Sequence, residues 1–271
     1  MPDVELVVTD LDGTFWHTDD HVHDRVLEAV RRLQGAGVAV LVATGRRRGS
    51  TRAPLARIGL APPAVMLNGA LGVHLSTGEQ FHRAPFSPDE AAVVLDAFRA
   101  GGLDPCVYVE HPSVEVFVST TPGTHPRHLR ELGEAAVPAD LDQAVVEHPV
   151  LAFGVIGVAR PAAVSVARAV EGLCEIHLDR ALDFPGATAV TIAPRGQSKW
   201  DGVVAYCRTA GLDPSRVLVL GDGPNDIELL TNAAVRLVPE DGHAEALALA
   251  DRVIPSPKAG GWAAVLDVLE V

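Results

Sequence analysis

Lysine is nearly absent from this chain. Its 271 residues include only Lys199 and Lys258, and its 22 lysines and arginines stand against 35 acidic residues, for a net charge of -13. Nucleic acids and anionic membranes are bound by basic surfaces, so we expect neither as a partner. Because lysine is so rare, the place of either one is more informative than usual.

Long apolar runs and cysteine pairs are also lacking. The longest apolar run, residues 150–159, is too short to span a bilayer, and the N-terminus has no basic segment followed by an apolar one, so no signal peptide is expected. The three cysteines, Cys106, Cys174 and Cys207, are far apart and form no C-x-x-C pair. This pattern predicts reduced structural thiols and a cytoplasmic location.

The residues that are present describe a folded protein with alternating strands and helices. Apolar residues make up 48% of the chain and charged residues 21%, as in soluble globular proteins. Residues 4–9 and 38–43 are apolar, strand-like runs, and residues 24–33 between them have helical spacing. A strand, a helix and a strand in this order predict two parallel strands.

The pattern changes after about residue 82 and returns about a hundred residues later. A helix at 87–100 is followed by strand-like runs, among them 106–110 and 150–158, which indicate an α+β insert. A strand at 190–193 and a helix at 198–210 resume the alternation. We therefore predict a doubly wound, mostly parallel (Rossmann-like) α/β domain made of residues 1–83 and 187–271, with an inserted α+β domain at 84–186.

The stretch Asp10-Leu11-Asp12-Gly13-Thr14 directly follows the first strand. Two carboxylates this close repel each other, which is unfavourable for stability but useful for holding a divalent cation. They can also divide two tasks, one attacking phosphorus and the other moving a proton. A solvated acidic turn is the simpler alternative for this motif taken alone.

Other predicted strands end in polar residues too. Thr44 follows the strand at 38–43, and Asn68 follows a strand at 64–67. Asp222, Asn225 and Asp226 follow the very apolar strand at 216–220. Because the carboxyl ends of parallel strands lie along one edge of a sheet, these residues are expected to converge with Asp10 and Asp12.

The order of these motifs resembles that of a known superfamily. Four segments carry the resemblance: Asp10-x-Asp12-Gly13-Thr14, Thr44-Gly45-Arg46, Lys199, and Gly221-Asp222-Gly223-Pro224-Asn225-Asp226. Together they are similar to the four motifs of the haloacid dehalogenase-like (HAD) phosphatases. The large insert and Asn68-Gly69-Ala70 resemble the Cof-type subclass IIB, which has a C2 cap domain. The resemblance implies a HAD core at 1–83 and 187–271 and a cap at 84–186.

The resemblance also implies a role for each motif residue. Asp10 would be the nucleophile that forms an aspartyl-phosphate, and Asp12 the general acid and base. Mg²⁺ would bind the Asp10 carboxylate, the Asp12 backbone carbonyl and Asp222, with Asp226 supporting this shell. Lys199 would offset the charge between Asp10 and the phosphate. The residues implied for contact with phosphate or substrate are Thr44, Gly45, Arg46, Asn68, Lys199 and Asn225.

These roles predict a Mg²⁺-dependent phosphatase for small phosphomonoesters such as sugar phosphates or related metabolites. A phosphotransferase or phosphomutase built from the same parts is the alternative, since only the group that accepts the phosphoryl differs. A non-catalytic sugar-phosphate sensor is a third reading, although a binding module has no need of both Asp10 and Asp12. The expected partner is a small phosphorylated metabolite, and the expected assembly is a monomer or a homodimer.

Overall fold

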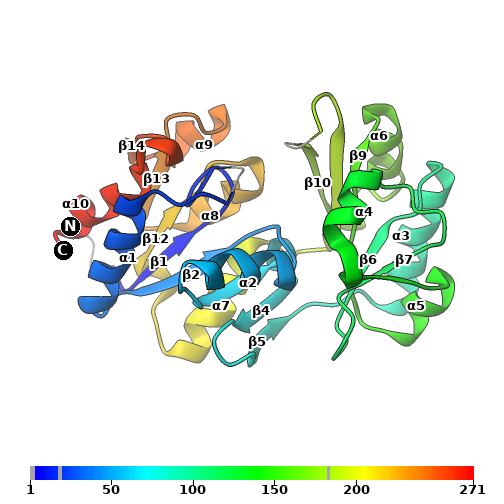
Figure 1. Ribbon diagram of the computed structural model, residues 1–271, viewed down its shortest axis with the longest axis horizontal. Helices are drawn as coiled ribbons and strands as arrows, with labels where there is room; N and C mark the ends of the chain where they lie inside the picture. Colours follow the sequence, from blue (N-terminus) through cyan, green and yellow to red (C-terminus); the bar gives the residue numbers. More distant parts are fainter. Residues whose placement is uncertain (1–3, 18–19, 182–183) are drawn as a thin grey trace. The chain divides into compact units, whose positions relative to one another are not determined.

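The computed structural model describes residues 4–17, 20–181 and 184–271, which fold into two compact units (Figure 1). The first unit consists of Met1–Arg46, Ser50–His82 and Ser198–Val271. The second consists of Arg47–Gly49 and Arg83–Gln197. In the part of the chain so described, no helix has both the length and the apolar character needed to cross a membrane.

The first unit is built on an eight-stranded sheet with the strand order β14-β13-β12-β1-β2-β3-β4-β5. The strands from β14 to β3 are parallel to their neighbours, and β4 is antiparallel to β3. The doubly wound, mostly parallel sheet predicted from the sequence is therefore confirmed. The strands are β1 (Leu6–Thr9), β2 (Ala39–Ala43), β3 (Pro63–Met66), β4 (Leu71–His74), β5 (Gln80–Arg83), β12 (Val217–Leu220), β13 (Val235–Pro239) and β14 (Arg252–Ile254).

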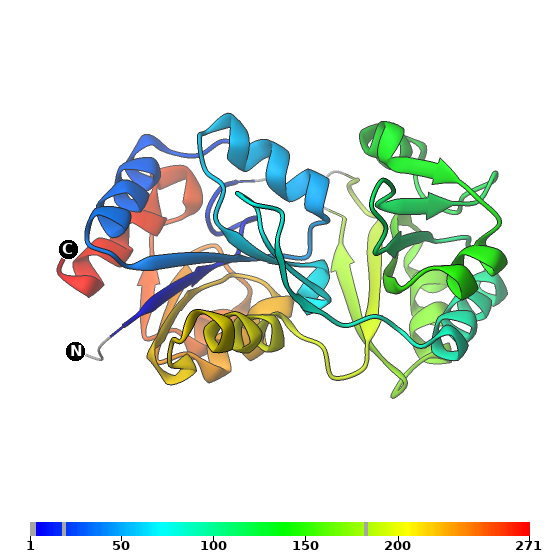
Figure 2. The same ribbon diagram turned by 90° about the horizontal axis from the view of Figure 1, so that it is seen from below.

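Helices cover both faces of this sheet, as its apolar central strands require. α1 and α7 lie on opposite faces (Figure 2), with α10 beside α1 and α8 beside α7. On the α7 face, Leu6 and Val8 of β1 are buried in one core with Val203 of α7 and Leu229 of α8. The helices are α1 (Asp24–Gly35), α2 (Arg48–Arg57), α7 (Lys199–Ala210), α8 (Ile227–Asn232), α9 (Ala244–Leu249) and α10 (Val265–Leu269).

The second unit has its own six-stranded sheet, ordered β10-β11-β9-β6-β7-β8, and its own core. Helix α3 begins at a capping box in which Ser87 and Glu90 bond reciprocally, followed by a first-turn proline. Its Phe98 packs against Phe153 of β9. The elements are α3 (Pro88–Ala100), β6 (Cys106–Val109), β7 (Val116–Val118), α4 (Pro126–Leu132), β8 (Ala136–Pro138), α5 (Leu141–Glu147), β9 (Val150–Val158), α6 (Arg160–Ala169), β10 (Cys174–Arg180) and β11 (Thr188–Pro194).

One strand was assigned to the wrong sheet. The strand predicted at 190–193 was expected to return to the first domain, but β11 pairs antiparallel with β10 and β9 in the second sheet. Its alternate residues Val190 and Ile192 are buried in the core of the second unit. Because of this pairing, the chain returns to the first unit at Ser198, about ten residues later than expected.

Candidate active site

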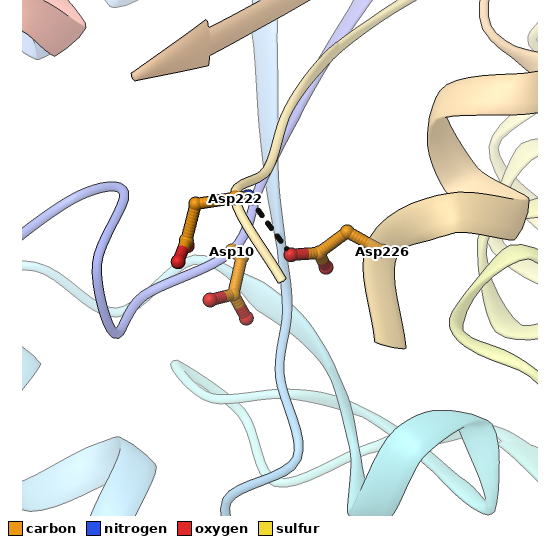
Figure 3. Close-up of side chains that lie close together, drawn as sticks. All are labelled: Asp10, Asp222 and Asp226. Atoms are coloured by element: carbon orange, nitrogen blue, oxygen red, sulfur yellow. Dashed lines mark hydrogen bonds between the residues drawn. The ribbon is translucent and has the colours of Figure 1, made fainter. Parts of the chain in front are cut away.

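Three carboxylates meet at one end of the parallel strands of the first unit (Figure 3). In register, Thr9 at the end of β1 lies beside Leu220 at the end of β12, so the residues that follow both strands are neighbours. The side chains of Asp10, Asp222 and Asp226 place one oxygen each within 4.8 Å of one another. The convergence expected from the motif order is thus present in the fold.

Lys199 is buried among these carboxylates. It is the first residue of α7, and its Nζ donates to Asp10 Oδ1 at 2.8 Å and to Asp226 Oδ1 at 2.7 Å. Burial lowers the pKa of Lys199, but the two carboxylates outweigh burial and raise that pKa above its usual range. The side chain therefore remains a cation that bridges motifs far apart in the sequence.

Asp226 organises the turn that carries Asp222. Its second oxygen, Oδ2, accepts hydrogen bonds from the backbone N–H groups of Asp222 at 3.0 Å and Gly223 at 2.9 Å, the first of which is drawn in Figure 3. The side chain is fully buried, and both its oxygens are bonded. Asp226 consequently fixes the loop after β12 and leaves Asp10 and Asp222 as the open carboxylates.

The remaining oxygens suit a divalent cation. Within the described ranges, Oδ2 of Asp10 and Oδ2 of Asp222 accept no hydrogen bond, whereas Asp222 Oδ1 accepts one from Thr14 Oγ1 at 2.6 Å. When ionised, the three carboxylates and Lys199 leave a net charge of -2. Carboxylate oxygens are the ligands that Mg²⁺ prefers, so these residues fit the ion that the sequence implies.

The pKa values of the two open carboxyls reflect this excess of negative charge. Burial, with the neighbouring Asp226, raises the pKa of Asp222 to about 7. Burial raises the pKa of Asp10 well above its usual range, although the Lys199 ammonium opposes the shift. Without a cation, ionising these groups at neutral pH therefore disfavours the folded state.

Replacing Asp222 with asparagine is therefore expected to stabilise the metal-free protein at pH 7, by on the order of 2 kcal/mol. The pKa of Asp222 is higher in the folded state than in the unfolded state. Ionised Asp222 therefore destabilises the wild-type fold above pH 7, and this destabilisation disappears as the pH falls toward about 4. Urea unfolding of the wild type and Asp222→Asn in EDTA, at pH 7 and pH 5, measures this difference in stability.

Mg²⁺ should make the wild type more stable than Asp222→Asn. Millimolar Mg²⁺ is expected to raise the melting temperature of the wild type and to leave that of Asp222→Asn nearly unchanged. Asp96→Asn, which removes an exposed carboxylate of α3, is the charge-matched control and should behave as the wild type. Equal Mg²⁺ shifts in Asp222→Asn and the wild type would contradict the assignment of Asp222 as a ligand.

A second group of predicted residues forms a polar rim beside the carboxylates. Asn68 N–H donates to the Thr44 carbonyl at 3.2 Å, and Asn68 Oδ1 accepts from Asn225 Nδ2 at 3.1 Å. A Cβ on Gly45 would come within 3.0 Å of Asn68 Oδ1. Thr44, Gly45, Asn68 and Asn225 therefore lie together, and their contact with phosphate or substrate stays a prediction.

The turn after β3 is held in a strained conformation. Leu67 and Asn68 have positive φ angles of 52° and 53°, and Gly69 follows at 112°. The strain of the two non-glycine residues costs on the order of 1 kcal/mol each. Hydrogen bonds from their N–H groups to the Arg46 and Thr44 carbonyls hold the turn against β2.

Gly69→Ala is expected to destabilise the protein by about 3 kcal/mol, because the new Cβ would lie 2.0 Å from the Ser198 carbonyl oxygen at the start of α7. Gly78→Ala is the matched control, since Gly78 has a φ of +78° but nothing within 4 Å of its Cβ position. The control should lose only about 1 kcal/mol. Similar losses in urea unfolding would mean that backbone strain, and not the contact with Ser198, sets the requirement for glycine.

Asp12 and Arg46 form a pair that the sequence did not predict. Arg46 Nε donates to Asp12 Oδ2 at 2.6 Å and Nη2 to Asp12 Oδ1 at 2.5 Å, while Nη2 also reaches Asp20 Oδ1 at 2.7 Å. Trp16 Nε1 donates to Asp12 Oδ1 at 3.0 Å. The sequence did not identify Trp16 or Asp20 as functional residues. The only indication for Trp16 was that a tryptophan stands beside the motif in a chain with 4% aromatic residues.

Comparisons with known proteins agree with this architecture. The family model described as haloacid dehalogenase-like hydrolase matches residues 7–266. The phosphoglycolate phosphatase of Methanopyrus kandleri is 25% identical over 264 residues, which cover 97% of this chain and 96% of that protein.

Solved structures share the same fold. A haloacid dehalogenase-like hydrolase from Bacteroides thetaiotaomicron has a TM-score of 0.77 at 18% identity, over 98% of this chain and 99% of that one. A sugar phosphatase described as HAD subclass IIB has a TM-score of 0.80, also at 18% identity, with 98% of this chain and 99% of that chain covered.

Proposed function

Because the chain belongs to the haloacid dehalogenase-like hydrolase family, and its relatives identify it as a phosphatase, we propose that it hydrolyses small phosphomonoesters. The proposed reaction depends on Mg²⁺ and passes through an aspartyl-phosphate intermediate. The observation that carries this proposal is the buried Lys199, which bridges Asp10 and Asp226. A lysine with a purely structural role is not expected to be buried at a site where three carboxylates converge. A lysine that offsets charge at a phosphate site is expected there.

Asp10 is the proposed nucleophile. Its Oδ1 is occupied by Lys199, and its Oδ2 is open. Attack by a carboxylate oxygen of Asp10 forms a new O–P bond while the ester O–P bond breaks, and the released alkoxide takes a proton from Asp12. Asp12 then accepts a proton from the water that hydrolyses the aspartyl-phosphate, which regenerates Asp10 and releases inorganic phosphate.

The surrounding residues offset charge and orient the phosphate. Asp10, the Asp12 carbonyl and Asp222 would hold Mg²⁺, with Asp226 supporting them, and the ion would supply positive charge for the phosphoryl group. Thr44 and the Gly45 N–H are proposed to bind phosphate oxygens. Lys199 offsets the charge between Asp10 and the phosphate, as its pairing with that carboxylate supports.

We assign the choice of leaving group to the second unit as a cap, because it is a separate folded insert with its own sheet and core. The proposed substrates are sugar phosphates or related metabolites. A sugar phosphatase shares the fold, and a phosphoglycolate phosphatase is similar in sequence over nearly the whole chain. The cytoplasmic location and the monomeric or homodimeric state stay predictions; the three cysteines are buried and form no disulfide.

Phosphate release from a panel of phosphomonoesters tests the proposal. The wild type should turn over several small esters with Mg²⁺ and none after EDTA treatment, and full activity in EDTA would contradict the proposed metal dependence. The same assay with added acceptor sugars separates hydrolysis from phosphoryl transfer, since a transferase would yield a phosphorylated acceptor in place of inorganic phosphate. Binding of sugar phosphates with no turnover on the whole panel would favour a sensor.

A further inference from the structure

Three aromatic side chains are packed beneath the Asp10–Asp12 motif. Phe15 meets Trp16 edge-on with ring centroids 5.8 Å apart, and it meets Trp262 edge-on at 5.4 Å. Trp16 and Trp262 are fully buried, and Phe15 is 3% exposed. Two of the three tryptophans of the chain are thus placed at the motif. We call Phe15, Trp16 and Trp262 the aromatic trio.

Each indole of the trio directs its N–H to the motif. Trp262 Nε1 donates to Thr9 Oγ1 at 2.9 Å, and this hydroxyl donates to the Asp10 carbonyl at 2.6 Å. Trp16 Nε1 donates to the side chain of Asp12. Trp262 therefore supports the backbone of the proposed nucleophile, whereas Trp16 contacts the proposed acid and base directly.

The backbone of Trp16 also closes the motif loop. The Gly13 N–H donates to the Trp16 carbonyl at 2.9 Å, and the Trp16 N–H donates to the Leu11 carbonyl at 3.0 Å. Because these bonds and burial in the trio fix its position, the indole cannot follow Asp12 if that side chain turns. It is therefore a fixed donor and not a mobile one.

Arg46 also holds this carboxylate. Its guanidinium lies 5.0 Å from the centre of the Trp16 ring, and it donates to Asp12 from two nitrogens. A two-point contact of this kind fixes the plane of a carboxylate. Further bonds to Asp20 and to the Ser50 carbonyl hold the guanidinium in place.

These bonds leave the two oxygens of Asp12 unequal. Oδ1 accepts from both Trp16 Nε1 and Arg46 Nη2, whereas Oδ2 accepts only from Arg46 Nε among the described residues. A carboxylate oxygen has two lone-pair sites, so Oδ1 is saturated and Oδ2 keeps one site open. A proton carried by Asp12 is therefore directed to Oδ2.

We propose that Trp16 is a positioning residue for the acid–base step, and that with Arg46 it holds Asp12 in one orientation with Oδ2 as the atom that gives and takes the proton. This inference rests on the proposed phosphatase function. It differs from a general structural role because it concerns only the proton transfers made by Asp12, of which the one to the leaving group falls within kcat/KM. Attack by Asp10 and binding of the metal do not depend on it.

Trp16→Phe tests the inference, because it keeps an aromatic ring in the trio and removes the N–H donor, and because the volume lost with the indole is matched in a Trp262→Phe control. The readout is kcat/KM for two esters, p-nitrophenyl phosphate and glycerol phosphate, since this ratio covers the steps up to release of the alcohol. Nitrophenolate leaves without a proton, whereas the glycerol alkoxide needs one. We expect kcat/KM to fall about 10-fold or more for glycerol phosphate and less than about 3-fold for p-nitrophenyl phosphate.

Two matched tryptophan variants serve as controls. Trp262→Phe removes the donor below Asp10, so any loss should be equal for the two esters. Trp200→Phe, on α7 away from the trio, should change neither. Thermal unfolding verifies that each variant is folded at the assay temperature.

The outcomes separate the inference from the function on which it rests. An active wild type whose Trp16→Phe variant loses the same factor on both esters, or loses nothing, would overturn the positioning role while leaving the phosphatase intact. A folded wild type that hydrolyses neither these esters nor the wider panel would overturn the proposed function and the positioning role with it.

Discussion

Asp10→Asn is expected to lower kcat for every phosphomonoester by about 10⁴-fold or more. The asparagine amide has the size of the carboxylate but is not a nucleophile, so no aspartyl-phosphate can form. Lys199 keeps its ion pair with Asp226, so the substitution leaves no buried cation without a partner. The pKa of Asp10 is raised by burial, and for this reason loss of its charge should not destabilise the fold.

The measurement combines steady-state turnover with trapping of the intermediate. Acid-quenched wild-type enzyme, mixed with a ³²P-labelled ester, should carry label that hydroxylamine releases, as an acyl phosphate does. Asp10→Asn should carry none, and the Asp96→Asn control should match the wild type. Substantial turnover by Asp10→Asn, or a labelled wild type that resists hydroxylamine, would rule out attack by this carboxylate.

Most of the first sheet could be predicted because its central strands are buried on both faces. Such strands are continuous apolar runs, as at 217–220, and the helices between them predict that they are parallel. The sequence did not indicate α2, which contains Pro54, or the strands β4 and β5. The two strands have four residues each and pair with strands close to them in the sequence, so they are too short to give a clear period, and the proline interrupts the helical pattern of α2.

The misassigned strand β11 shows a different limit. Val190 and Ile192 alternate with less buried residues, and this period predicts a strand but not the sheet that it joins. β11 joins the second sheet because β9 and β10 offer it hydrogen-bonding edges and a shared core within the second unit. A pattern local to seven residues carries no information about that competition.

The site was predictable where each residue acts through a motif at a strand end. Asp10, Asp222 and Asp226 come together as their places at strand ends predicted, and Lys199 lies beside Asp10 and Asp226 as the family resemblance implied. The hydrogen bonds around Asp12 were not predictable, because they join parts of the chain that no local pattern connects. Arg46 shows this: the resemblance implied a substrate contact, and the fold places its guanidinium on Asp12 and Asp20.

The two lysines offer the sharpest test of buried charge in this protein. Lys199 is 1% exposed and pairs with two carboxylates, whereas Lys258 is exposed and makes no ion pair within the described part of the chain. Removing one partner of a buried ion pair typically costs about 3–5 kcal/mol, because the remaining charge has neither water nor a counterion. Exposed lysines contribute little.

Lys199→Met is therefore expected to lose about 3–5 kcal/mol of unfolding free energy in EDTA at pH 7 and, when assayed with Mg²⁺, all measurable phosphatase activity, while Lys258→Met loses neither. Methionine keeps the length of the lysine stem, so the loss reports on charge and not on a cavity. Without the Lys199 ammonium, the pKa of Asp10 in the folded state is raised still further. Lowering the pH protonates this carboxylate and should therefore return part of the lost stability. Urea unfolding at pH 7 and pH 5 measures this recovery. A loss that does not shrink at pH 5 would show that packing around α7, and not the two orphaned carboxylates, accounts for the effect.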